Sequence, residues 1–223
     1  TDFTMSIGNK IAAVRRTLPA GVELVAVSKY HPAEAIREAY DAGQRVFGEN
    51  RPQEMKAKHE ILPRDIEWRM IGHLQTNKVK YIAPFVSMIE SLDSERLAAA
   101  IDKEAAKHGR TIDCLLEIHV ADEDTKSGWD YDELDAFVRG GGFDAYRNIR
   151  IRGVMGMATN TDDETVIRRD FMRLADCKRS LADCFGPEFD TLSMGMSDDY
   201  PIAVECGSTE VRIGSDIFGA REY

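Results

Sequence analysis

Several features that would place the chain in a special class of proteins are missing from its sequence. Only 4 of the 223 residues are cysteine, and Cys114, Cys177, Cys184 and Cys206 include no C-x-x-C pair. No His/Cys cluster has the spacing of a zinc site, so we expect no metal. No apolar run is long enough to span a membrane, and no signal peptide is recognisable. Together these absences favour a cytoplasmic protein with reduced thiols.

Positively charged residues are also fewer than negatively charged ones. The chain has 29 Lys and Arg residues against 39 Asp and Glu residues, which gives a formal net charge of −10. This balance argues against nucleic acid or an anionic membrane as the main partner, although a local positive pocket for a small anion stays open. Apolar material is plentiful, because 43% of the residues are hydrophobic and can form a sizeable core.

Short apolar runs alternate with helical patterns along nearly the whole chain. The runs predict eight strands, at 23–28, 45–48, 67–72, 87–91, 112–120, 151–157, 189–195 and 210–214. Helical patterns follow them at 32–42, 52–61, 78–83, 94–107, 131–139, 162–182 and 198–204. Expected N-cap residues are Asn77, Ser94, and Thr161 in a capping box with Glu164.

This alternation predicts the α/β class, with a single (β/α)8 TIM barrel preceded by an extra helix over roughly residues 6–17. A doubly wound open sheet is the alternative, but no G-x-G-x-x-G follows the first strand to favour it. No linker or shift of composition divides the chain, so residues 1–223 are predicted to form one domain.

The first predicted strand ends in Lys29, and Pro32 prevents its continuation. Lysine is rarely buried, and at the end of a buried strand desolvation lowers its pKa and makes its amine a nucleophile. The alternative is that Lys29 only marks where the strand meets water. Barrel active sites lie at the carboxyl ends of strands, and the second and third strands lead into Asn50 and His73.

The last two strands lead into segments suited to a phosphate. Met196 and Ser197 precede the helix predicted at 198–204, and Gly214 and Ser215 precede a turn at 216–219. Both segments offer backbone N–H groups, a hydroxyl and a helix dipole that favours an anion, and glycine allows close approach. The alternative is that both serines are simple helix caps.

A phosphate site opposite a strand-end lysine predicts pyridoxal 5′-phosphate, whose aldehyde forms a Schiff base with a lysine amine. Arg212 lies two residues before Gly214 and therefore points to the same side of its strand, into the barrel. A buried guanidinium needs an acceptor. The pyridine nitrogen of the cofactor would serve, and so would a salt bridge to Glu49 or Glu117.

Four segments, AVSKYHP, VFGEN, IGHLQTNK and SMGMSDDYPIAVECGSTEVRIGSDIFGAR, resemble the pyridoxal-phosphate homeostasis protein family, one-domain relatives of the N-terminal barrel of alanine racemase. The resemblance runs in order from about residue 6 to 221. It implies a cofactor-binding barrel whose site residues have separate tasks: Lys29 binds the cofactor, Ser197, Gly214 and Ser215 hold its phosphate, Arg212 lies near the ring nitrogen, and Asn50 and His73 line the pocket.

The resemblance implies a protein of vitamin B6 homeostasis that binds pyridoxal phosphate without established catalytic turnover, so we expect no enzyme and no catalytic residue. Its partners would be the cofactor and, transiently, pyridoxal-phosphate-dependent apoenzymes. Tyr30 and His31 stand where many relatives have a second lysine, so any transfer role of that lysine would fall to Lys78 or Lys126. The alternatives are an amino-acid racemase, which needs a base on each face of the cofactor, and a cofactor-free Schiff-base aldolase.

Overall fold

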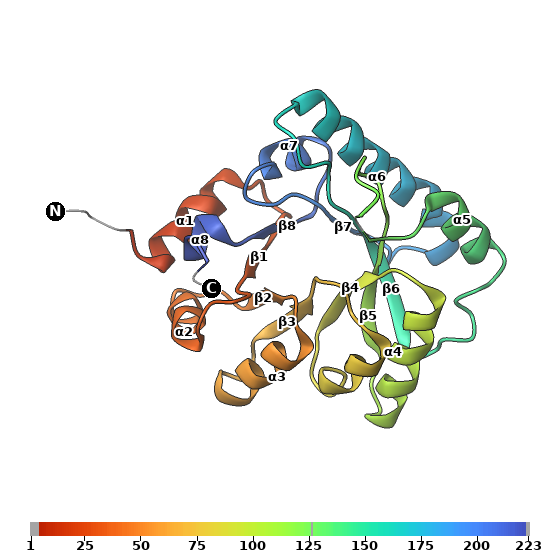
Figure 1. Cartoon of the computed structure of the whole chain (residues 1–223), viewed down its shortest axis with the longest axis horizontal. Coiled ribbons are helices and arrows are strands. Elements are labelled where there is room, and N and C mark those ends of the chain that lie inside the picture. The colour runs from red at the N-terminus through yellow and green to blue at the C-terminus, as the bar shows by residue number, and fades with distance from the viewer. Residues whose placement is uncertain (1–4, 126, 222–223) are drawn as a thin grey trace.

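The computed structural model describes residues 5–125 and 127–221 and contains a closed barrel of eight parallel strands (Figure 1). Each strand pairs with its neighbours in chain order, and β1 closes the barrel by pairing with β8. The strands are β1 (Glu23–Val27), β2 (Val46–Glu49), β3 (Glu67–Met70), β4 (Met88–Leu92), β5 (Ile112–Glu117), β6 (Ile149–Met155), β7 (Thr191–Ser193) and β8 (Glu210–Ile213). All eight predicted strands are confirmed.

Helices surround the strands, as Figure 1 shows. They are α1 (Ile7–Thr17), α2 (Ala33–Asp41), α3 (Pro52–Ile61), the 3-10 helix η1 (Thr76–Tyr81), α4 (Glu95–Lys107), α5 (Tyr131–Arg139), α6 (Glu164–Phe185), α7 (Tyr200–Glu205) and α8 (Ser215–Phe218). The extra helix α1 precedes β1 and packs against α2 and α8. The prediction of a (β/α)8 barrel with an additional N-terminal helix is therefore confirmed. Within the described residues, none of these helices combines the length and hydropathy needed to cross a membrane.

One of the three expected helix caps is confirmed. Ser94 caps α4, where its side chain accepts a hydrogen bond from the Leu97 amide at 3.1 Å. The capping box at Thr161 is wrong, because α6 begins later and Asp163 caps it by accepting from the Thr165 amide. A carboxylate at this position also complements the positive end of the helix dipole.

The helix predicted at 78–83 is also shifted. The structure has the 3-10 helix η1 there, whose N-cap is Gln75, so Asn77 lies inside the helix. The tighter 3-10 geometry suits so short a segment, in which one buried side chain, Val79, anchors the helix.

Apolar side chains between the strands and the outer helices form the main core, with Phe47, Trp68 and Phe171 among the largest that are completely buried. One glycine is required by this packing. The register of β5 against β6 shifts at Leu115, which lies opposite Gly153. A Cβ atom at Gly153 would lie 1.9 Å from the Thr191 carbonyl oxygen on β7, so only glycine fits at this bulge.

Candidate functional site

Lys29 lies two residues after the end of β1, half-buried in a depression of about 360 Å³ at the carboxyl ends of β1 and β8. The closed barrel brings these two strand ends side by side although they are far apart in sequence. Of the predicted site residues, the depression therefore unites three. Its lining consists of Val27, Lys29, His31, Gly214, Ser215, Gly219, Ala220 and Arg221.

The surroundings of Lys29 lower the pKa of its amine below the ordinary value for lysine. Partial burial is the largest cause, and the positive charges of Arg221 and Arg212 act in the same direction, while Glu49 opposes them. A lowered pKa increases the fraction of neutral amine near pH 7. Lys29 is therefore suited to act as a nucleophile toward an aldehyde.

Arg212 points into the barrel, as expected, and only 3% of its surface is exposed. Its Nη1 donates to Ser193 Oγ at 2.6 Å and its Nη2 donates to the Gly156 carbonyl at 3.1 Å. Neither of the two salt bridges that the sequence suggested, to Glu49 or to Glu117, occurs among the ion pairs of the described chain. A guanidinium carries five N–H groups, so Arg212 keeps further donors for a ligand.

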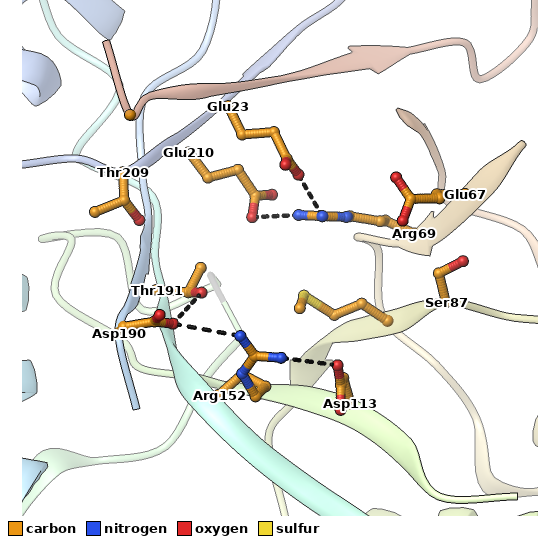
Figure 2. Close-up of a pocket in the computed structure, with 12 residues that line it drawn as sticks. Glu23, Glu67, Arg69, Ser87, Asp113, Arg152, Asp190, Thr191, Thr209 and Glu210 are labelled. Carbon is orange, nitrogen blue, oxygen red and sulfur yellow. Dashed lines mark hydrogen bonds and ion pairs between the residues drawn. The ribbon is translucent and has the colours of Figure 1, made fainter. Parts of the chain in front are cut away.

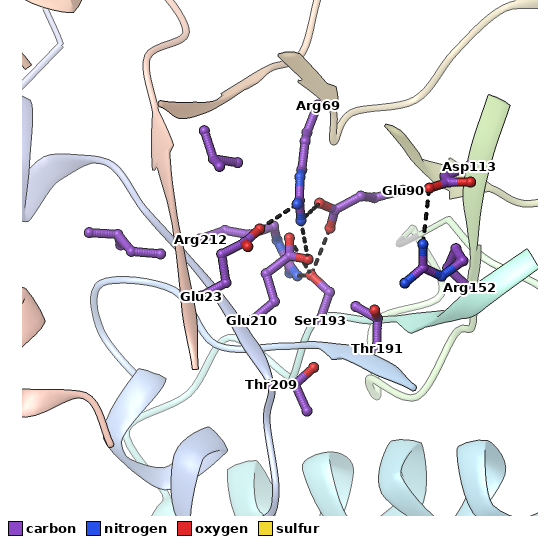
Figure 3. A network of polar contacts seen from close by, with 12 residues as sticks. Glu23, Arg69, Glu90, Asp113, Arg152, Thr191, Ser193, Thr209, Glu210 and Arg212 are labelled. Atoms are coloured by element: carbon purple, nitrogen blue, oxygen red, sulfur yellow. Dashed lines mark hydrogen bonds and ion pairs between the residues drawn. The ribbon is translucent and has the colours of Figure 1, made fainter. Parts of the chain in front are cut away.

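Beneath Arg212, a network of charged side chains fills the interior of the barrel (Figure 3). Ser193 Oγ bonds to Glu90 Oε1 at 2.7 Å and lies 3.3 Å from Glu210 Oε1. Arg69 Nη1 donates to Glu210 Oε2 at 2.6 Å and lies 3.7 Å from Glu90 Oε2. Burial and the neighbouring Glu90 raise the pKa of Glu210 well above its ordinary value, so the network favours a proton on Glu210.

A second depression, of about 410 Å³, lies at the opposite end of the barrel (Figure 2). Its two guanidinium groups are already paired: Arg69 with Glu23, and Arg152 with Asp113 at 3.2 Å and Asp190 at 3.5 Å. In barrels of this kind the amino ends of the strands serve stability, whereas ligands bind at the carboxyl ends. We therefore assign these ion pairs to the stability of the fold.

Met196 and Ser197 lie in the tight turn between β7 and α7 and are not part of the lining of the Lys29 depression. The Met196 amide donates to Asp199 Oδ1 at 2.8 Å, and the Met196 carbonyl accepts from the Tyr200 amide at 2.9 Å. The Met196 side chain is exposed, whereas Ser197 is half-buried. The Met196 backbone is thus engaged within the turn itself.

Asn50 and His73 stand at the same end of the barrel but outside that lining. Asn50 packs against Gly72, where a Cβ atom would lie 2.8 Å from Asn50 Cγ. His73 is 63% exposed, with Nδ1 3.4 Å from Asp93 Oδ2, and it borders a separate depression of about 490 Å³. The structure therefore places His73 in a different hollow from Lys29, and Asn50 lines neither of the two.

Lys78 and Lys126 are the two lysines predicted to take over the role of a second cofactor lysine. Lys78 lies in η1, with its Nζ 5.7 Å from the centre of the Tyr81 ring. It does not line the Lys29 depression. Lys126 lies outside the described residues.

Sequence reasoning missed Arg221, which lines the depression beside Lys29, and Lys58, which is buried behind it. Lys58 donates to Glu49 Oε1 at 2.6 Å. A signal for Lys58 was present, because it lies three residues after Met55 and four before Leu62, on the buried face of α3. No comparable signal marks Arg221, which follows the last helix.

A family model described as "Alanine racemase, N-terminal domain" matches residues 5–222. The pyridoxal phosphate homeostasis protein of Vibrio alginolyticus is 40% identical over 92% of this chain and 89% of its own length. That of Aquifex aeolicus is 39% identical, with 90% and 88% covered. The chain therefore belongs to the alanine racemase N-terminal domain family and, within it, to the pyridoxal phosphate homeostasis proteins.

Solved structures agree with this assignment. The structure of PipY from Synechococcus elongatus PCC7942 with PLP bound has a TM-score of 0.88 and 37% identity, and the match covers 96% of this chain and 100% of PipY. Alanine racemase from Bartonella henselae, with covalently bound pyridoxal phosphate, has a TM-score of 0.72 and 15% identity. The match covers 96% of this chain and 58% of the racemase. The racemase likeness shows the shared barrel alone.

Glu117 at the end of β5 should make the stability of the protein depend on pH. It is buried, accepts a hydrogen bond from Ser127 Oγ at 3.0 Å, and burial raises its pKa from 4.5 to about 7. The folded state thus binds this proton more tightly than the unfolded state, so the free energy of unfolding falls as pH rises from 4.5 to 7. Between pH 5 and 8, we expect the free energy of unfolding to fall by roughly 2–3 kcal/mol less in Glu117→Gln than in the unmodified protein.

Urea unfolding at a series of pH values measures the effect. The control is Glu60→Gln on the exposed surface of α3, which should follow the unmodified protein. Parallel stability curves for Glu117→Gln and the unmodified protein would show that Glu117 does not hold a proton near neutral pH.

Proposed function

We propose that the protein binds pyridoxal 5′-phosphate through Lys29 and keeps this reactive cofactor sequestered and available in the cell. The observation that carries the proposal is a lysine of lowered pKa in one depression with Gly214 and Ser215. The relatives named as pyridoxal phosphate homeostasis proteins and the PLP-bound structure of PipY support it. When bound, the cofactor supplies an aldehyde that condenses with an amine.

The residues of the depression fit this ligand. The neutral Lys29 amine attacks the aldehyde carbon, and loss of water leaves a Schiff base. The hollow of about 360 Å³ is in the usual size range of small-molecule sites. In a chain with a net charge of −10, Arg212 and Arg221 form a local positive region beside Lys29 that suits a phosphate-bearing ligand.

The phosphate is assigned to the start of α8, with Ser197 contributing from the turn after β7. The first N–H groups of a helix lack partners within it, and the backbone bonds of α8 begin at Ile217. Gly214 allows this turn to pack against β1, because a Cβ atom there would lie 3.2 Å from the Val27 carbonyl. Arg221 lies beside it and adds a positive charge.

Arg212 is assigned to the ring nitrogen, with Asn50 lining the mouth of the site on the far side of β1. Arginine only donates hydrogen bonds, so it leaves an acceptor nitrogen unprotonated. An unprotonated ring withdraws electrons poorly, and this suits storage of the cofactor more than amino-acid chemistry.

We further propose that residues 1–223 act as one barrel domain in the cytoplasm, with transient contact to pyridoxal-phosphate-dependent apoenzymes. The four cysteines support a reducing compartment, because all four are free thiols and three of them are buried.

The proposal includes the absence of racemase turnover. Racemisation needs a base on each face of the cofactor plane, and each such group contributes roughly 10²–10⁴-fold. The Vibrio relative, which is 40% identical, is named a pyridoxal phosphate homeostasis protein, whereas the Bartonella racemase shares only 15% identity. We expect no conversion of L- to D-alanine at the usual enzymatic rates of roughly 1–10³ s⁻¹. Chiral chromatography measures this conversion, and turnover at such rates would contradict a storage role.

Lys29 should carry the cofactor. Borohydride reduction of the loaded protein followed by peptide mapping should place the label on Lys29, and Lys29→Ala should abolish the absorbance of the covalent complex. The fold should persist, because the apolar run of β1 is untouched. Lys78→Ala is the control and should bind normally. A label on another lysine, with Lys29 unmodified, would refute the assignment.

Ser215→Ala should weaken binding of pyridoxal 5′-phosphate by about tenfold or more, because a hydrogen bond to a charged group contributes roughly 1.5–3 kcal/mol. The same substitution should barely change binding of pyridoxal, which has no phosphate. Absorption titration measures both affinities. Equal affinity of the unmodified protein for the two compounds would mean that the phosphate contributes nothing to binding and would refute this assignment.

A further inference from the structure

The turn that carries Lys29 has an unusual backbone. Tyr30, the next residue, has φ = 66°, a value that residues other than glycine rarely adopt. Such a conformation is strained and persists only where surrounding contacts determine it. The two peptide groups that flank Lys29 contain the Ser28 carbonyl on one side and the Tyr30 amide on the other, and helix α3 contacts both.

Two side chains one turn apart on α3, Glu54 and Lys58, make these contacts. Lys58 Nζ donates to the Ser28 carbonyl at 2.9 Å, and the Tyr30 amide donates to Glu54 Oε1 at 2.7 Å. Lys58 Nζ also donates to Glu54 Oε1 at 2.9 Å and to Glu49 Oε1 at 2.6 Å. The side chain of Lys58 is 9% exposed and that of Glu54 is 22% exposed, so both are largely removed from water.

Stability alone is a poor explanation for this arrangement. Burying an ion pair costs desolvation energy that its attraction often fails to recover, and apolar residues of similar volume frequently serve as well. Apolar side chains, however, could not bond to a carbonyl and an amide. The polar atoms of Glu54 and Lys58 form hydrogen bonds with the two peptide groups next to Lys29. Their placement is therefore explained by an effect on Lys29.

We propose that Glu54 and Lys58 are positioning residues for Lys29, which clamp its two flanking peptide groups and so hold its amine in the depression beside Gly214 and Ser215. The inference rests on the proposed function, in which Lys29 bonds to the cofactor. The clamp acts through the backbone, since the charged groups that act on the Lys29 amine are Arg212 on β8, Arg221 after α8 and Glu49 on β2.

The same helix offers a matched control pair. Lys56 and Glu60 are also four residues apart on α3, but their charged atoms are 4.0 Å apart and their side chains are 49% and 59% exposed. They differ from Glu54 and Lys58 in burial and in having no contact with the Lys29 turn among the described hydrogen bonds.

The test compares Glu54→Ala, Glu54→Gln and Lys58→Met with Lys56→Met and Glu60→Gln in the full chain. Trace labelling with acetic anhydride across a range of pH, read by peptide mass spectrometry, reports the pKa and reactivity of Lys29 without the cofactor. Absorption titration with pyridoxal 5′-phosphate then gives the affinity, and thermal unfolding confirms that each variant is folded.

Glu54→Ala should raise the pKa of Lys29 toward its ordinary value, because a loosened turn lets the amine reach water, and should weaken cofactor binding about tenfold. Glu54→Gln keeps an oxygen that accepts from the Tyr30 amide and should restore most of the affinity. The Lys56 and Glu60 variants should match the unmodified protein. If Lys58→Met fails to fold because Glu49 is left buried without its cation, the two Glu54 variants still decide.

A folded Glu54→Ala protein with an unchanged Lys29 pKa and unchanged affinity would overturn the positioning role. Equal losses in Glu54→Ala and Glu54→Gln would also overturn it, since charge rather than the bond to Tyr30 would then be responsible. Failure of the proposed function is recognised separately, because in that case Lys29→Ala would bind the cofactor as well as the unmodified protein does.

Discussion

The hydrogen bond from Arg212 to Ser193 connects the ligand end of the barrel to the charges that fill its interior. Arginine can only donate, so Ser193 must accept from it and has its own proton left for a carboxylate. Glu90 Oε1, at 2.7 Å, is the nearer of the two candidates. Arg212 therefore donates to Ser193, and Ser193 in turn donates to a carboxylate. At the other end of the network, Arg69 donates to Glu210. A cation could not stay at this depth without such a chain of acceptors.

A similar balance governs Lys29 at the mouth of the barrel. Partial burial and two guanidinium groups disfavour its charged form, and among the described residues Glu49 opposes them. Burial raises the pKa of Glu49 to about 7 despite its contact with Lys58, and its Oε2 has no hydrogen-bond partner among the described residues. Glu49 therefore carries only part of a negative charge near neutral pH, and its power to keep Lys29 protonated is reduced. Lys58 acts in the opposite direction on this carboxyl, because its ammonium lowers the pKa of Glu49 and favours the charged form.

The sequence was sufficient for the parts of this arrangement that depend on chain order. Eight apolar runs with helices between them predict a barrel, and its closure brings the ends of β1 and β8 together, which unites Lys29 with Gly214 and Ser215. The choice of partners was not predictable in this way. Glu49 and Glu117 were reasonable acceptors for Arg212, but a neutral serine on the neighbouring strand and the carbonyl of Gly156, the residue after β6, were nearer. Such choices depend on side-chain geometry that periodicity does not contain.

Tyr30 shows how a departure from the family pattern is accommodated. The family resemblance implies a second lysine shortly after the first, whereas here the aromatic ring of Tyr30 lies under the guanidinium groups of Arg51, at 4.9 Å, and Arg221, at 5.7 Å. A second ammonium there would stand among these cations and near Lys29 itself, and like charges at such distances repel. An aromatic face instead attracts them. Tyr30 thus helps to hold Arg221 beside the depression, where the positive charge of Arg221 also lowers the pKa of Lys29.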